Sequence, residues 1–253
     1  SLVTISLLLV GCGVQDNASL KTDDSAPLKP VLIVSGGNSS CERDENKDYT
    51  PVGMGMYSKF QQLLADTAER SIAVDYVLTC YRNYNETFDV HYIFSDDPDT
   101  IHVAPREDFY VDLDRFLDVT APGPIIMAGH SYGGWLTMRA VIDLNREFEA
   151  AYTLDAISQV ECRFTRPFGC TSDPRDIKAD ERQLIRDNTG IWANFYQTQT
   201  FYLHSGKMEH ADRNHRLSTS HNGIKTRNEI WDSIYARTVA AAGQSFATSL
   251  AMK

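Results

Sequence analysis

The chain has 253 residues, of which 42% are hydrophobic and 23% are charged, values that are ordinary for a soluble globular protein with one full core. Its formal charge of −10 and pI near 5.1 disfavour nucleic acids and anionic membrane surfaces as direct partners, because both bind basic patches. We therefore expect a single soluble domain and no nucleic-acid partner.

The first residues of the chain indicate an export signal. Residues 1–11 are apolar and uncharged, but they are far shorter than the roughly 20 residues that span a bilayer. The run Leu9-Val10-Gly11 ends at Cys12 and looks like a bacterial lipoprotein signal, which implies cleavage before Cys12 and acylation of its thiol. A cysteine in an ordinary signal peptide or a buried strand would look the same. No basic segment or initiator Met precedes the run, so we expect the natural chain to begin further upstream.

The segment that follows the acylation site is polar and has no hydrophobic periodicity. Residues 12–29 therefore predict a flexible tether with a reach of roughly 20 Å. Gly13 rather than Asp follows the cysteine, which implies sorting to the outer membrane in a Gram-negative bacterium. We expect an exported protein that faces the periplasm or the cell surface and contacts the membrane only through this lipid anchor.

An apolar run at residues 30–34 opens the predicted globular domain. It is followed by Ser35-Gly36-Gly37-Asn38, which predicts a buried strand that ends in a tight turn. The turn lacks the Gly-Lys-Ser/Thr ending of a phosphate-binding loop, and the chain contains no Gly-x-Gly-x-x-Gly. We therefore expect no nucleotide here and no cofactor.

The next segments alternate between helical and extended patterns. Apolar residues at helical spacing predict helices over Met54–Glu69 and Asp108–Leu117, and an apolar run predicts a strand over Ile72–Leu78. This alternation is typical of a mostly parallel sheet flanked by helices.

A Gly-x-Ser-x-Gly motif lies between a strand and a helix in the middle of the chain. Residues 125–128 are a short apolar run, and residues 132–145 carry apolar side chains as expected of a helix packed on a sheet. A serine on such a strand-to-helix turn needs very small neighbours two positions away, which Gly129 and Gly133 supply. The pattern predicts that Ser131 is a nucleophile, although a glycine-rich turn in any α/β protein would contain the same residues.

A nucleophilic serine needs an acid and a base elsewhere in the chain. Asp155 interrupts a small apolar run, so we expect it at the carboxyl end of a strand, where α/β sheets expose functional groups. The next predicted strand, over residues 192–197, is followed by no Asp or Glu until after Met208. Asp155 is therefore the predicted acid, with Asp212 and Glu209 as alternatives. A carboxylate that only caps the following loop would look the same.

Four histidines follow the predicted acid, and His221 suits the role of base best. It lies in a polar loop, residues 218–223, just before an amphipathic segment at residues 226–241. His215 is the alternative, and His204 lies in an aromatic run typical of a packing residue. These histidines match no zinc-binding spacing, so we expect no metal site.

The negative charge that forms when a carbonyl is attacked needs two amide donors. The residue after the nucleophile, Tyr132, is expected to supply one of them, and Gly37 in the turn after the first core strand is expected to supply the other. A simple turn after a strand would contain the same glycines.

Four cysteines remain after Cys12, an even number that suits an oxidising compartment. We expect Cys162 to pair with Cys170 around a loop near the predicted acid, and Cys41 to pair with Cys80. Other connectivities and free buried thiols remain open. Residues 173–186 beyond this loop are charged and predict a solvated helix over the site.

Together these motifs resemble the α/β-hydrolase superfamily over about Lys29 to Lys253. The resemblance is carried by the following residues: Val34 to Asn38, Gly129 to Gly133, Leu154-Asp155 and His221. An acid directly after the elbow unit looks like the arrangement in pancreatic-type lipases. Residues 194–197 and 211–214 look similar to a group of uncharacterised bacterial serine hydrolases. The chain departs from many members at Ser35, where they have His before Gly.

The resemblance implies an α/β-hydrolase fold in one catalytic domain over residues 30–253. It implies a serine hydrolase that cleaves a small-molecule carboxylic ester or thioester through an acyl-enzyme, with a Ser-Asp-His order along the chain. The alternative is a catalytically silent protein with a hydrolase fold, used for binding or for envelope architecture.

Overall fold

The computed structural model describes residues 29–37, 52–84, 87–120, 123–158, 170–171, 174, 176–199 and 203–251. The predicted signal and tether up to residue 28 lie outside these ranges, as do Cys12, Cys41 and Cys162.

Within the described residues, eight strands form one sheet in the order β10-β8-β6-β5-β1-β2-β3-β4. The strands are β1 Val31–Gly37, β2 Asp75–Tyr84, β3 Thr87–Phe94, β4 Asp97–Pro105, β5 Ile125–His130, β6 Ala150–Leu154, β8 Trp192–Tyr196 and β10 Arg213–Arg216. The strands from β10 to β2 pair in parallel, and β3 and β4 form an antiparallel edge. A separate small sheet pairs β7 (Cys170–Thr171) with β9 (Leu203–His204).

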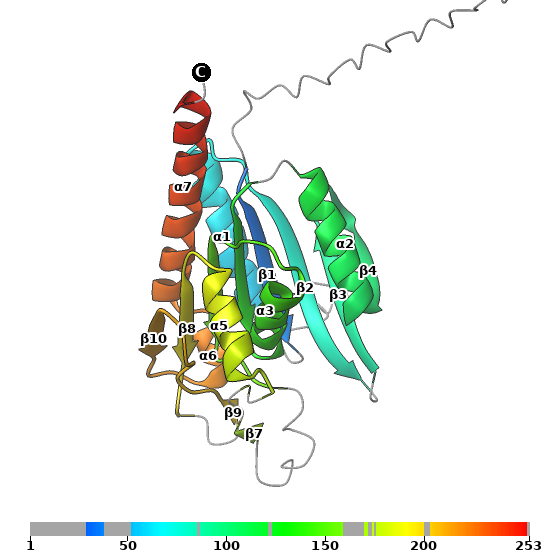
Figure 1. Cartoon of the computed structure of the whole chain (residues 1–253), viewed down its shortest axis with the longest axis vertical. Helices are drawn as coiled ribbons and strands as arrows, with labels where there is room; N and C mark the ends of the chain where they lie inside the picture. The colour runs from blue at the N-terminus through cyan, green and yellow to red at the C-terminus, as the bar shows by residue number, and fades with distance from the viewer. Residues whose placement is uncertain are drawn as a thin grey trace, which may run out of the picture.

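Helices cover both faces of the sheet, and each face has its own hydrophobic core. The helices are α1 Met54–Glu69, α2 Arg106–Val119, α3 Tyr132–Asp143, α5 Ala179–Asp187, α6 His221–Ile224 and α7 Asn228–Ala251. Figure 1 shows α2, α3 and α5 in front of the sheet and α1 and α7 behind it. The front core contains Phe109, Leu113 and Leu136, and the back core contains Phe60 and Ile230. The predicted fold class, a mostly parallel sheet flanked by helices, is confirmed.

The central strands are parallel because they can be buried on both faces. β1, β5, β6 and β8 are buried along their whole length, as expected of strands that carry continuous apolar runs. The chain order reverses where β1 lies beside β5, and Ser35 pairs there with Gly129. In open α/β sheets such a reversal creates a crevice at the carboxyl ends of the strands, where ligands bind.

The antiparallel edge hairpin was not predicted from the sequence. On β3, the buried Val90 and Tyr92 alternate with the partly exposed Asp89 and His91. This period-two pattern could have revealed the strand. β4 gives no comparable signal because it is an edge strand exposed over most of its length. Its Pro98 is tolerated there for the same reason.

Several predicted elements have different bounds in the structure, including the following two. The strand predicted over residues 72–78 begins later and runs to Tyr84, because β2 continues along β3. The helix predicted over residues 173–186 begins at Ala179, where Glu181 accepts a hydrogen bond of 2.9 Å from the Lys178 amide. Pro174 lies before this start, and the residue that precedes a proline is disfavoured in a helix.

The cysteine pairings remain predictions. Cys80 on β2 is fully buried and disulfide-bonded, and it pairs in register with Gly36 of β1. Its predicted partner Cys41 lies outside the described residues. Cys170 begins β7, and its predicted partner Cys162 also lies outside them.

Candidate active site

Ser131 occupies a strained turn between β5 and α3. Its backbone has φ 61° and ψ −127°, in the left-handed half of backbone space that side chains other than glycine rarely adopt. A Cβ atom on Gly129 would lie 2.2 Å from the carbonyl oxygen of Gly133, and one on Gly133 would lie 2.3 Å from that of Ser35. The turn therefore requires glycine at both positions, for the steric reason inferred from the motif.

The structure brings Ser131, Asp155 and His221 into one hydrogen-bonded chain. His221 Nε2 lies 3.1 Å from Ser131 Oγ, and His221 Nδ1 lies 2.7 Å from Asp155 Oδ2. The three residues are at most 3% exposed. Because a carboxylate only accepts, Nδ1 carries the proton in this pair, which leaves Nε2 free to accept the serine proton.

Asp155 is held as an acceptor by donors on every side. It follows β6 directly, with φ 45°, and its amide donates to the carbonyl oxygen of Phe195 on β8. Ser205 donates to Oδ1 from its amide at 2.7 Å and from its hydroxyl at 2.9 Å, and Gln197 Nε2 donates to Oδ2 at 2.8 Å. Burial alone would raise the pKa of this carboxyl, but the hydrogen bonds it accepts outweigh burial and hold the pKa below its ordinary value of 3.8.

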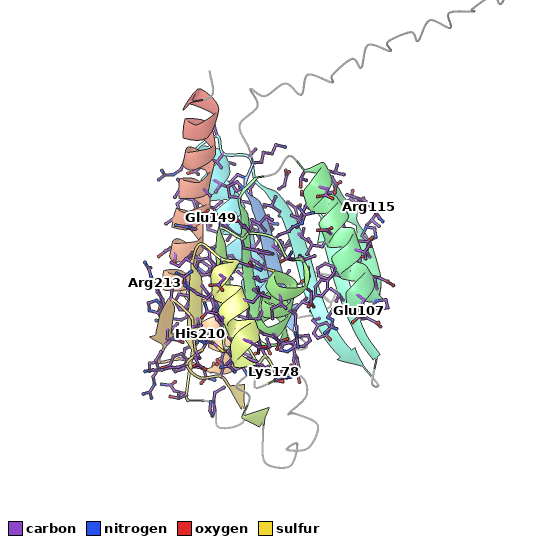
Figure 2. All side chains as sticks on the ribbon, viewed as in Figure 1. Glu107, Arg115, Glu149, Lys178, His210 and Arg213 are labelled. Carbon is purple, nitrogen blue, oxygen red and sulfur yellow. The ribbon has the colours of Figure 1, made fainter. Side chains whose placement is uncertain are left out.

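The alternative base and acids lie elsewhere. His215 is on the exposed edge strand β10, where its ring stacks on Phe195 with centroids 4.8 Å apart. Figure 2 shows Arg213 of the same strand at one side of the molecule, opposite Glu107 and Arg115 on α2. Asp212 accepts from the Trp192 amide at the amino end of β8, the end of the sheet away from Ser131.

The remaining candidates are also outside the cluster. Glu209 is exposed and lies 3.8 Å from the ring nitrogen of His210. His204 is partly exposed, and its Nδ1 lies 3.1 Å from the carbonyl oxygen of Ser205. His221 itself begins the short helix α6, where the sequence predicted a loop, and Ser220 caps this helix by accepting from the Gly223 amide.

Gly37, the last residue of β1, packs directly against the elbow. A Cβ atom built on Gly37 would lie 2.6 Å from the Tyr132 amide nitrogen and 2.8 Å from that of Gly133. The close approach places residue 37 against Tyr132, the residue that follows Ser131. It also leaves no room for a side chain at position 37.

If Gly37 is an oxyanion donor, as the sequence predicts, replacing it with alanine should lower kcat for the expected ester hydrolysis by about 10²-fold to 10³-fold, the usual loss when one such donor is lost. The added methyl would push the β1 turn or the elbow amides out of place. Initial rates with a p-nitrophenyl ester measure the effect. Gly243→Ala is the matched control, because nothing lies within 4 Å of the methyl it adds. Equal rates for the two variants would contradict a role for Gly37.

His130, between Gly129 and Ser131, is a site residue that the sequence analysis missed. It is fully buried, its Nε2 lies 2.8 Å from the carbonyl oxygen of His221, and the centroids of the two histidine rings are 4.7 Å apart. Burial, and then the neighbouring His221, lower the pKa of His130 well below its ordinary value of 6.5. Its position at the end of a buried strand next to the nucleophile was the available signal.

The lowered pKa of His130 predicts a loss of stability in mild acid. Below pH 6.5 the unfolded chain binds a proton at this histidine that the folded chain does not, so the free energy of unfolding falls as pH falls. One such proton contributes a slope of up to about 1.4 kcal/mol per pH unit. Urea unfolding between pH 7.5 and pH 5 should show a shallower slope for His130→Gln than for the wild type. Identical slopes for the two proteins would show that protonation of His130 does not account for the loss of stability in acid.

Two further properties concern the described residues only. No group of three His, Cys, Asp or Glu side chains in the described ranges could hold a metal ion. No helix in this part of the chain has the length and apolar character needed to cross a membrane.

Comparison with known proteins gives structural likenesses only. No protein-family model matches the chain, and no curated protein sequence is significantly similar to it. Est1E from Butyrivibrio proteoclasticus, solved with ferulic acid bound, has a TM-score of 0.48 and 11% identity, covering 87% of this chain and 92% of that one. The thioesterase domain from the curacin biosynthetic pathway has a TM-score of 0.45 and 10% identity, covering 85% and 92%. A structure of the metagenome-derived lipolytic enzymes LipS and LipT has a TM-score of 0.44 and 14% identity, covering 87% and 96%.

The architecture itself identifies the fold. A serine with positive φ lies between a parallel strand and a helix at the carboxyl edge of the sheet, and it is followed along the chain by a carboxylate and then a histidine. This strand-turn-helix elbow with that chain order is the arrangement of α/β-hydrolases. The described part of the chain has the α/β-hydrolase fold.

Proposed function

We propose that this protein is a serine hydrolase that cleaves carboxylic esters or thioesters through a covalent acyl-enzyme. The observation that carries the proposal is the unbroken chain of hydrogen bonds from Ser131 Oγ through both nitrogens of His221 to Asp155. A serine hydroxyl is a weak nucleophile unless a positioned base removes its proton. A buried carboxylate that accepts from Nδ1 keeps that base in the tautomer it needs.

In the first half of the reaction, Ser131 Oγ attacks the carbonyl carbon of the ester. Its proton passes to His221 Nε2, and the imidazolium that results is stabilised by the ionised Asp155. The carbonyl oxygen becomes an oxyanion that the amides of Tyr132 and Gly37 receive. The tetrahedral intermediate then breaks its bond to the leaving group, which takes the proton from His221 and departs as an alcohol or thiol.

In the second half, water replaces the leaving group. His221 Nε2 removes a proton from the water as it attacks the acyl carbon, and the same two amides receive the second oxyanion. Collapse of this intermediate returns the proton to Ser131 Oγ and releases a carboxylic acid. In both halves His221 acts first as a base and then as an acid. Because the pKa of Asp155 is lowered, this carboxylate stays ionised and can stabilise the imidazolium each time it forms.

Hydrolysis of a panel of p-nitrophenyl esters with graded acyl chains, and of a matched thioester, tests this proposal. The purified full-length protein should release p-nitrophenol at a rate that saturates with substrate, and Ser131→Ala should not. A folded wild-type protein that cleaves neither class under reducing or non-reducing conditions would favour the alternative, a catalytically silent binding protein of the envelope.

We also propose that the protein is anchored to the bacterial envelope through an acylated Cys12. The support is the sequence Leu9-Val10-Gly11-Cys12 and the polar segment that follows it. Expression in a Gram-negative host with an alkyne-tagged fatty acid should label the wild-type protein in the membrane fraction. Cys12→Ala should remain unlabelled, and equal labelling of both would contradict the anchor.

A further inference from the structure

The base of the proposed triad is carried by a very short element. His221 is the first residue of the four-residue helix α6. An isolated helix this short is not stable in water, so contacts with neighbouring elements hold it in place.

His130 supplies one such contact from the strand that carries the nucleophile. It is the last residue of β5, and its Nε2 lies 2.8 Å from the carbonyl oxygen of His221, 91 residues along the chain. A carbonyl oxygen only accepts, so Nε2 of His130 carries the proton in this contact. The contact joins the elbow to the base by a route that does not pass through Ser131 Oγ.

The His130 ring also packs beside the ring of the base. The two centroids are 4.7 Å apart with 39° between the planes, and both rings are at most 3% exposed. Because burial keeps His130 neutral, it places no second positive charge against the imidazolium that forms on His221 during the reaction. The neutral form of histidine, with its proton on Nε2, therefore suits a position beside the proposed base.

We propose that His130 is a positioning residue for the hydrolysis proposed above. Asp155 fixes the Nδ1 side of the base, and His130 fixes its backbone, so that Nε2 stays within reach of Ser131 Oγ. The inference rests on the proposed function for its kinetic readout, and on the contact between His130 and the His221 carbonyl for its geometry.

Two amide variants at position 130 separate positioning from simple packing. Gln places its Nε2 at about the reach of the histidine Nε2, and Asn is one methylene shorter and falls short of the carbonyl. His130→Asn should lower kcat about 10-fold to 100-fold with little change in KM, as expected when one buried hydrogen bond is lost in the transition state. His130→Gln should recover most of that loss. His130→Leu replaces the Asn variant in the comparison if the latter does not fold.

Thr238→Val provides the control for the general cost of losing a buried hydrogen bond. Thr238 is fully buried on α7 and donates to the Ile234 carbonyl at 2.9 Å, and we expect its loss to lower stability without lowering kcat. Equal kcat values for the Gln and Asn variants, whether both high or both low, would overturn the positioning role.

A spectroscopic readout keeps this test independent of turnover. In the wild type and in His130→Gln, the His221 Nδ1 proton shared with Asp155 should give a downfield, slowly exchanging NMR resonance. It should broaden or disappear in His130→Asn, and an unchanged resonance would overturn the proposal. If the wild type cleaves no ester, the proposed function fails, and this resonance still decides the role of His130.

Discussion

His221→Ala should lower kcat for ester hydrolysis by about 10⁴-fold or more while the protein stays folded, as expected for removal of a triad member. The alanine removes the group that takes the proton from Ser131 Oγ in the proposed mechanism, and His221 Nε2 lies 3.1 Å from that oxygen. Steady-state rates with a p-nitrophenyl ester give the loss, and thermal unfolding of both proteins gives the check on folding.

His215→Ala is the matched control, because this histidine was the alternative base and lies on the exposed edge strand β10. We expect its kcat to stay near that of the wild type. If His215→Ala lost activity and His221→Ala kept it, the assignment of the base would be wrong.

Asp155→Asn should lower kcat by about 10³-fold to 10⁴-fold, because an amide facing His221 Nδ1 favours the wrong imidazole tautomer. An amide nitrogen at this position also meets donors from Ser205 or Gln197, so we expect some loss of stability. Urea unfolding separates this loss from the loss in kcat.

Asp212→Asn is the comparison for the acid. Asp212 contacts Arg186 at 2.7 Å and the Trp192 amide at 2.8 Å, so its replacement should cost stability and leave kcat nearly unchanged. A larger fall in kcat for Asp212→Asn than for Asp155→Asn would rule out Asp155 as the acid.

The elements around the site could be predicted because their signals are local. The helix α1 has the predicted bounds, Met54–Glu69, since its apolar residues recur at helical spacing and one face is buried. The elbow was predictable because sterics demand glycine at positions 129 and 133. The place of Asp155 followed from the rule that parallel strands present their carboxyl ends to the site.

The partners of these residues could not be predicted, because they come together only in the folded chain. Ser205 and Gln197 donate to Asp155 although no sequence pattern marks either residue as its partner, and His130 meets the His221 carbonyl across 91 residues. Of the edge hairpin, β3 carries a period-two pattern, but β4 could not be predicted because it is largely exposed and buries too little to show one. The spacing of apolar residues indicates which face of an element is buried, but it indicates little about which polar groups form hydrogen bonds in the folded chain.

Reaction with a fluorophosphonate, followed by mass spectrometry of the labelled peptides, tests most directly whether the chain around residue 131 makes a reactive hydroxyl. We expect one phosphonyl adduct per protein, on Ser131, which is lost in Ser131→Ala and forms much more slowly in His221→Ala. A folded wild-type protein that takes up no label, or that carries it on a different residue, would contradict the account.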